Sequence, residues 1–307
     1  MNILFVGDIF GSAGRKIVRE HIGHVRKAND VDLTIINAEN AAGGFGVTPQ
    51  IADDLFELGA DVLTTGNHVW DKRELVEYMN SARPDSQDRA RRVLRPANFQ
   101  PGLPGHGVYE GTTQGGVPYA VINLMGRVFM NATNDPFHAI NDILKTIKAK
   151  VIVVDFHAEA TSEKVAMGWH LDGRVTAVVG THTHVPTADA RVLPQGTAYI
   201  TDVGMTGARG GVLGFQRELA VGALVTQMPT RLLPAEEDPW LMGVLVSSSR
   251  DGAVAVWPFA NALPIASWKI AVDISPVLTA RTAVNANCFA VILPPESKAL
   301  KSVSHLQ

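Results

Sequence analysis

Two histidines separated by one residue, His182 and His184, follow an apolar run from Val175 to Val179 and a glycine, Gly180. The run is typical of a buried strand that stops at the glycine. Side chains at i and i+2 of an extended backbone point to the same side, so both imidazoles are expected to face one pocket at the carboxyl end of a strand. Imidazole is the commonest protein ligand of transition metals, and the pair indicates a metal site. The motif alone is also compatible with two polar histidines in a surface turn.

Other predicted strands end in side chains of the same chemistry. These residues are Asp8, Glu39, Asn40, Asn67 and His157, and His68 stands beside Asn67. Asp8 could instead cap the helix that follows it. His68 faces another way from Asn67, which makes it available for proton transfer rather than coordination.

The donor types restrict the metal. Carboxylate, carboxamide and imidazole groups without a thiolate suit manganese, iron(II), cobalt or zinc, whereas calcium and magnesium prefer more oxygen ligands. The candidate ligands outnumber those that one tetrahedral ion needs. Two ions about 3.5–4 Å apart that share a carboxylate would use them all. The sequence therefore predicts two divalent transition-metal ions, and manganese, iron, cobalt and zinc all suit the donors.

Repeated strand–helix units must position these residues. Apolar runs predict strands over residues 3–6, 33–37, 61–65, 119–125, 151–156, 175–179, 198–203, 219–226, 241–249 and 253–257. Helices are predicted over 11–27, 48–59 and 136–148, and from a cap at Thr161 or Ser162 to Leu171. Such units followed by consecutive strands indicate the α/β class, with a mixed sheet or two stacked sheets flanked by helices.

Composition narrows the class of protein. The chain has 307 residues, of which 46% are hydrophobic and 19% charged, as in an ordinary globular enzyme. The formal net charge of −3 predicts no stable binding to nucleic acid or to a membrane. The single cysteine, Cys288, excludes an intrachain disulfide and a thiolate zinc cluster. No leader or membrane span is recognisable, so a cytoplasmic location is expected.

Together the strand-end residues make the sequence resemble the calcineurin-like metallophosphoesterases, and more closely their bacterial YmdB-like branch of 2′,3′-cyclic-nucleotide phosphodiesterases. The matching stretches are 7–11, 37–40, 65–68, 155–164 and 180–184, and the resemblance extends over residues 1–259. Two departures from the broad superfamily, Phe10 in place of histidine and Glu39 in place of aspartate, are shared by the YmdB-like branch. Asn40 is the expected substitute for the missing imidazole, and the two changes leave the metal's identity open.

The resemblance implies a fold and a mechanism. The fold is a four-layer α/β/β/α sandwich of two mixed sheets, with the metals at the top of the sheets. One metal takes Asp8, Glu39, Asn40 and His184, and the second takes Glu39, Asn67, His157 and His182. The implied reaction is hydrolysis of small phosphodiesters by a hydroxide that bridges the metals. His68 is the implied catalytic residue, which protonates the leaving oxygen or steadies the pentavalent phosphorus.

Alternatives remain at this point. The same scaffold could serve a phosphomonoesterase or 5′-nucleotidase, or a regulatory RNA- or protein-binding module with a structural metal site. Five arginines between Arg83 and Arg95 indicate a solvated face or a phosphate-recognising flap. Residues 260–307 are predicted as an extension outside the metallophosphoesterase domain, of unknown role. It could be an edge element, a contact in a homo-oligomer or a poorly ordered segment.

Overall fold

The computed structural model describes residues 1–83, 88–248 and 254–262. All of them belong to one compact unit, Met1–Ala266. The extension predicted for residues 260–307 lies outside the described residues, apart from residues 260–262, which end a strand. None of the helices in the described part of the chain has the length and apolar character needed to cross a bilayer.

The first sheet has seven strands, in the order β11–β12–β1–β2–β3–β4, with β13 paired to β12. Strands β1 to β4 are parallel, and β11, β12 and β13 add antiparallel partners. The bounds are β1 (Asn2–Val6), β2 (Leu33–Asn37), β3 (Val62–Thr64), β4 (Val93–Leu94), β11 (Gly207–Ala208), β12 (Pro239–Ser248) and β13 (Val254–Ala262).

The second sheet has six strands in the order β5–β6–β7–β8–β10–β9. Strands β6, β7, β8 and β10 are parallel, and β5 and β9 are antiparallel edges. The bounds are β5 (Val108–Thr112), β6 (Pro118–Met125), β7 (Val151–His157), β8 (Ala177–Thr181), β9 (Arg191–Val192) and β10 (Ala198–Ile200). The helices are α1 (Gly11–Ala28), α2 (Pro49–Glu57), α3 (Arg73–Asn80), the 3₁₀ helix η1 (Arg89–Arg92), α4 (Pro136–Leu144), α5 (Thr161–Leu171) and α6 (Arg217–Thr226).

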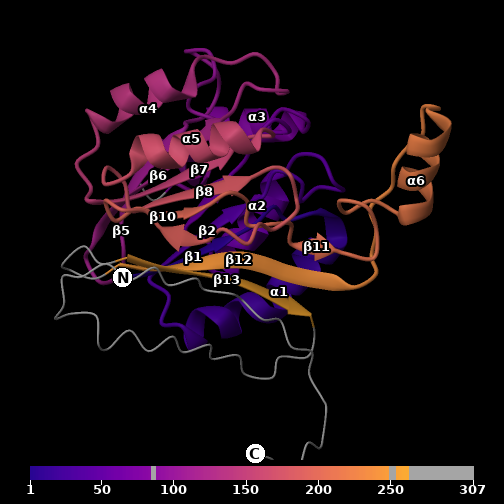
Figure 1. Cartoon of the computed structure of the whole chain (residues 1–307), viewed down its shortest axis with the longest axis horizontal. Helices are drawn as coiled ribbons and strands as arrows, with labels where there is room; N and C mark the ends of the chain where they lie inside the picture. The colour runs from indigo at the N-terminus through magenta and orange to yellow at the C-terminus, as the bar shows by residue number, and fades with distance from the viewer. Residues whose placement is uncertain (84–87, 249–253, 263–307) are drawn as a thin grey trace, which may run out of the picture. The chain divides into compact units, whose positions relative to one another are not determined.

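Alternating side chains of the strands divide the unit into four layers. In β1, Leu4 and Val6 pack in an apolar cluster with α1, α2 and α3, whereas Ile3 and Phe5 pack against residues of the second sheet. The outer face of the second sheet packs against α4 and α5, and Figure 1 shows α5 lying over β7 and β8. The predicted α/β/β/α sandwich of two mixed sheets is confirmed.

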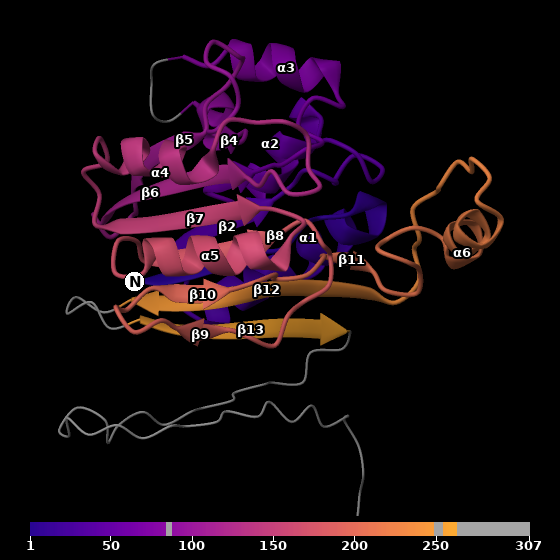
Figure 2. The same cartoon turned by 45° about the horizontal axis from the view of Figure 1, so that its top comes forward.

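One predicted strand is wrong. Residues 219–226 belong to helix α6, which stands apart from both sheets in Figures 1 and 2. Leu224 and Val225 leave 75% and 76% of their surface exposed. A short apolar run does not distinguish a strand from a helix, and here the segment is rich in alanine and leucine, which favour a helix. Helix α3 and strand β5 carry no strong pattern and were not predicted, and the N-cap of α5 is Ala160 rather than Thr161 or Ser162.

Candidate metal centre

The carboxyl ends of strands from both sheets meet at one place and bring all the predicted ligands together. From the first sheet, Asp8 follows β1, Glu39 and Asn40 follow β2, and Asn67 follows β3. From the second, His157 ends β7, and His182 and His184 follow β8. Neighbouring parallel strands deliver their carboxyl ends to the same edge, so residues far apart in sequence converge there.

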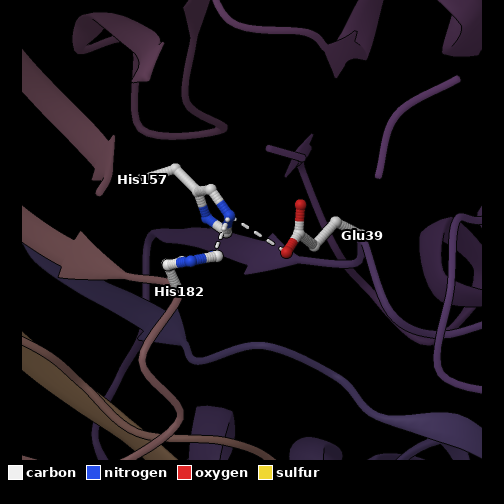
Figure 3. A group of neighbouring side chains, drawn as sticks. All are labelled: Glu39, His157 and His182. Carbon is white, nitrogen blue, oxygen red and sulfur yellow. Dashed lines mark hydrogen bonds and ion pairs between the residues drawn. The ribbon is translucent and has the colours of Figure 1, made fainter. Parts of the chain in front are cut away.

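The first group of contacts centres on Nε2 of His157. This atom lies 3.0 Å from Oε1 of Glu39, 2.9 Å from Oδ1 of Asn67 and 3.0 Å from Nδ1 of His182. The ligand atoms of Glu39, His157 and His182 all lie within 4.8 Å of one another. Figure 3 shows these three side chains pointing toward a common centre.

A second group adjoins the first. Nε2 of His184 lies 3.3 Å from Oδ2 of Asp8 and 3.1 Å from Nδ2 of Asn40. Asn40 in turn lies 3.1 Å from Oε1 of Glu39. The carboxylate of Glu39 therefore contacts both groups.

The backbone of the two histidines differs from the prediction. Strand β8 continues through Gly180 to Thr181, and then His182 and His184 adopt φ angles of 99° and 64°. The segment is therefore a turn with positive φ at both histidines and not an extended strand. The predicted extended backbone is wrong, although both imidazoles reach the site. Such angles cost free energy in residues other than glycine and persist only where surrounding contacts hold them, often at functional sites.

Each imidazole is oriented through the nitrogen that faces away from the group. Nδ1 of His157 lies 2.9 Å from Oγ1 of Thr181, Nε2 of His182 lies 3.2 Å from Oε2 of Glu159, and Nδ1 of His184 lies 3.2 Å from the carbonyl oxygen of Leu213. An oxygen that accepts this N–H fixes the ring and its tautomer and leaves the other nitrogen to bind a metal.

A buried carboxylate behind His157 joins the two sheets. Asp155 of β7 accepts hydrogen bonds from Thr64 at 2.5 Å, from Thr181 at 2.7 Å and from Asn37 at 3.1 Å. Burial raises the pKa of Asp155 to about 7, although His157 and the two hydroxyl donors oppose the rise. No role is predicted for Asp155 from the sequence. The available signal is its place two residues before His157, on the same face of an otherwise apolar strand.

The electrostatics of the site favour positive charge. Burial alone would raise the pKa of Glu39 and lower that of His157, but the attraction and hydrogen bond between them reverse both directions. Burial opposes protonation of His184 too, yet Asp8 raises its pKa. Burial and the nearby His157 lower the pKa of His182 to about 3. Two buried carboxylates thus dominate the field at this edge of the sheets, which is the condition that a cation site requires.

The donor set fits a metal ion. Thr181 accepts the hydrogen on Nδ1 of His157, so Nε2 of His157 carries a lone pair. This lone pair faces oxygens of Glu39 and Asn67 and a nitrogen of His182, and one proton could not bridge all three contacts. Two ligands bound to one ion at about 2.1 Å lie about 3 Å apart, as these atoms do. Oδ1 of Asp8 is buried without a hydrogen-bond partner among the described residues. A side chain at Gly66 would collide with His157 and Glu39, so a glycine is needed there to leave space at the centre.

His68 lies at the rim of the group. Its Nδ1 is 2.8 Å from Oδ2 of Asp71, and its backbone N–H donates to Oε2 of Glu39 at 3.4 Å. The imidazole is 28% exposed and contacts the ring of Phe45, with 5.1 Å between ring centroids. Asp71 was not singled out in the sequence, although its spacing from His68 suits such a contact.

The arginines between 83 and 95 make contacts within the fold. Arg89 lies 3.3 Å from Asp53, Arg92 lies over the ring of Phe56, and Arg95 donates to the carbonyl oxygens of Pro96 and Pro104. These contacts favour a structural surface over a phosphate-recognising flap for these three residues. Residues 84–87 lie outside the described part of the chain.

The chain matches a protein family and several known proteins. A family model described as YmdB-like protein matches residues 4–256. A protein of Bacillus subtilis strain 168, the 2′,3′-cyclic-nucleotide 2′-phosphodiesterase, is 46% identical over 248 residues, which are 80% of this chain and 90% of that protein.

Two solved structures share both fold and sequence. A hypothetical protein from Thermus thermophilus superposes with a TM-score of 0.79 at 37% identity, over 86% of this chain and all of that chain. A protein described as a novel phosphatase from Mycoplasma pneumoniae gives a TM-score of 0.78 at 31% identity, over 85% of this chain and 93% of that chain.

Proposed function

Since the chain belongs to the YmdB-like family, we propose that it is a metal-dependent phosphodiesterase that hydrolyses 2′,3′-cyclic nucleotides or similar small phosphodiesters. One observation carries the proposal: acids, amides and imidazoles from both sheets converge on one centre, with Glu39 in contact with both halves. The substrate class follows the name of the B. subtilis relative, which matches this chain over most of its length.

The residues suit two divalent transition-metal ions, and iron or manganese is proposed ahead of zinc or cobalt. Asp8, Glu39, Asn40 and His184 would hold one, and Glu39, Asn67, His157 and His182 would hold the other. For Asn40, a half-turn of the side-chain amide presents Oδ1 in place of Nδ2. When bound, such ions lower the pKa of water and neutralise charge on the phosphoryl oxygens.

The residues at the rim handle the leaving group. In hydrolysis, the oxygen of water joins phosphorus, the P–O2′ bond breaks, and O2′ must gain a proton because an alkoxide is a poor leaving group. His68 lies beside the group without being part of its contacts to His157 and His182, and Asp71 holds its ring through Nδ1. His68 therefore serves as the general acid, and the product is a nucleoside 3′-phosphate.

A substrate panel tests the assignment. The metal-loaded protein is assayed with 2′,3′-cAMP, 3′,5′-cAMP, AMP and an aryl phosphodiester, and fastest turnover of 2′,3′-cAMP to adenosine 3′-phosphate is expected. A phosphomonoesterase is the second candidate, because the M. pneumoniae protein of similar structure is described as a phosphatase. Turnover of AMP alone would replace the phosphodiesterase proposal by the monoesterase.

Elemental analysis of the purified protein tests the number and identity of the ions, with two per chain expected. The variants Asn67→Ala and His68→Ala test the alternative of a regulatory RNA- or protein-binding module with a structural metal. An enzyme should lose most of its turnover in both variants, whereas a binding module should keep its regulatory effect. A cytoplasmic location and a possible homo-oligomer stay predictions, which cell fractionation and light scattering measure.

A further inference from the structure

Three phenylalanines from separate segments form an aromatic cluster (Phe10, Phe45 and Phe215) beside the metal centre. The ring of Phe10 packs edge-on against Phe215 at 4.8 Å and against His184 at 5.7 Å. Phe45 lies 5.6 Å from Phe215 and 5.1 Å from His68, measured between ring centroids. The aromatic cluster therefore extends from a candidate metal ligand to the candidate general acid.

Only one ring of the aromatic cluster is open to solvent to a large extent. Phe10 is buried, with 3% exposed, and Phe215 is half-buried, whereas Phe45 is 38% exposed. Core packing accounts for the first two rings but not for an apolar ring left partly in water at the edge of a polar site. Exposure alone does not distinguish Phe45, because Phe129 and Trp169 are more exposed, but its ring contacts the candidate general acid His68.

The loop that carries Phe45 is built to hold it there. Gly43, Gly44 and Gly46 have positive φ angles, and the N–H of Ala42 donates to the carbonyl oxygen of Gly46 at 2.9 Å. A side chain at Gly44 would collide with the ring of Phe10, and one at Gly46 would collide with Lys72. The loop is thus fitted closely to its surroundings on both sides of Phe45, which places the ring before a ligand binds.

We propose that Phe45 is the stacking surface for the nucleobase of the substrate. The inference rests on the proposed function. In a 2′,3′-cyclic nucleotide, only C2′ and C1′ separate O2′ from the base, so a base must lie close to the group that protonates O2′. Among the described residues, Phe45 is the aromatic ring in contact with His68.

The chemistry of stacking also sets the specificity. Every base presents a π-face, so a phenylalanine accepts all four bases and contributes no hydrogen-bond readout. Purines offer the larger face and should bind more tightly than pyrimidines. The stacking ring therefore favours 2′,3′-cyclic nucleotides with either kind of base over cyclic phosphates that lack a base.

Paired substrates test this role. Steady-state constants of wild type, Phe45→Ala, Phe45→Leu and Phe45→Trp are measured with 2′,3′-cAMP and with glycerol 1,2-cyclic phosphate, a cyclic diester without a base. We expect Phe45→Ala and Phe45→Leu to raise KM for 2′,3′-cAMP about tenfold and Phe45→Trp to keep it near the wild-type value. Constants for the glycerol ester should stay the same in all three variants. The control is Trp169→Ala, which removes an exposed ring on α5. It should leave the steady-state constants for both substrates at the wild-type values.

Each result bears on one of the two proposals. Equal losses with both substrates would mean that Phe45 only supports the packing of His68, and unchanged KM in Phe45→Ala would mean that the base binds elsewhere. Either outcome overturns the stacking role while the phosphodiesterase remains. A wild-type protein that hydrolyses neither diester would overturn the proposed function, and the inference with it.

Discussion

His68 depends on a partner that lies three residues further along the chain. Asp71 accepts from Nδ1 at 2.8 Å, and this contact turns Nε2 outward, away from the carboxylate. The contact therefore orients the ring, with Nε2 free to face a leaving oxygen. Because the side chain of Asp71 is 40% exposed, water competes for this contact and its effect should be modest.

The first prediction concerns this pair. Replacement of His68 by alanine should lower kcat by about a hundredfold or more, the usual contribution of a general acid. The metal content should stay at the wild-type level, because the imidazole does not belong to the group around His157. Steady-state rates on 2′,3′-cAMP and elemental analysis of the same samples measure both quantities.

Two comparison variants sharpen the result. Asp71→Asn keeps the size of the side chain but removes its charge, and a smaller loss of kcat is expected than in His68→Ala. Asn67→Ala should lose metal as well as activity, because its amide oxygen contacts Nε2 of His157. Wild-type rates in His68→Ala would refute the assigned role of this histidine.

Single residues were predictable where their chemistry is unusual for their position. A carboxylate or imidazole directly after an apolar run is conspicuous, and the structure brings every such predicted residue to one place. Asp155 gives only the weak signal of its place two residues before His157, and a phenylalanine between glycines such as Phe45 gives no signal by itself. Their roles come from neighbours on other strands, which the sequence of one chain does not reveal.

At the level of elements, the turn that carries the two histidines is fixed by a buried ion pair. Nζ of Lys164 on α5 lies 2.7 Å from Oδ2 of Asp202, and both side chains are almost fully buried. The same carboxylate accepts hydrogen bonds from the N–H and the hydroxyl of Thr183, which stands between His182 and His184. Asp202 thereby links a helix to the strained turn.

The second prediction follows from that link. Lys164→Met leaves Asp202 buried without its partner, which should destabilise the fold by about 3–5 kcal/mol. Metal should also be lost faster on dialysis, because the turn is no longer held in its left-handed conformation. Thermal unfolding of the metal-free protein measures the loss of folding stability. The metal retained after dialysis measures the loss of metal binding.

A matched control exists on the surface. Lys145 and Asp142 have the same separation of 2.7 Å, but both side chains are about three-quarters exposed. Lys145→Met should therefore leave stability and metal retention unchanged. Equal behaviour of Lys164→Met and Lys145→Met would show that the buried pair does not position the turn.

Elements were predictable in proportion to their burial. The strands of the two sheets are apolar runs between glycines and polar residues, and their order in the chain follows the repeated strand–helix pattern. Helix α6 was mistaken for a strand because only Ala220 is buried there, so packing leaves no period to recognise. The turn at His182 could not be foreseen either, since its φ angles come from Asp202 and other tertiary contacts.

At the scale of the molecule, the metal centre lies where two sheets meet. Asp8, Glu39 and Asn67 come from the first sheet, and His157 and His182 come from the second. Direct hydrogen bonds also cross between the sheets, from Asn37 and Thr64 to Asp155. Ions bound by ligands of both sheets would hold the sheets together, so metal binding and folding should be coupled.

Removal of the metal is therefore expected to destabilise the whole unit, which is the final prediction. An ion present at about 100 times its dissociation constant stabilises the folded state by about 2.7 kcal/mol if it does not bind the unfolded chain. For a unit of this size, that change raises Tm by about 5–10 °C. Calorimetry of chelator-treated protein, before and after addition of Mn²⁺ or Fe²⁺, measures the difference.

The variant Glu39→Gln isolates the cause of that shift. It removes the charge of the acid that contacts both groups of ligands and keeps its size, so added metal should raise its Tm much less than that of wild type. Calcium serves as a control ion, because it prefers more oxygen ligands than the centre offers. If wild type and Glu39→Gln gain the same stability from Mn²⁺, the ion binds outside this centre. The convergence of the two sheets on Glu39 would then serve packing rather than metal binding.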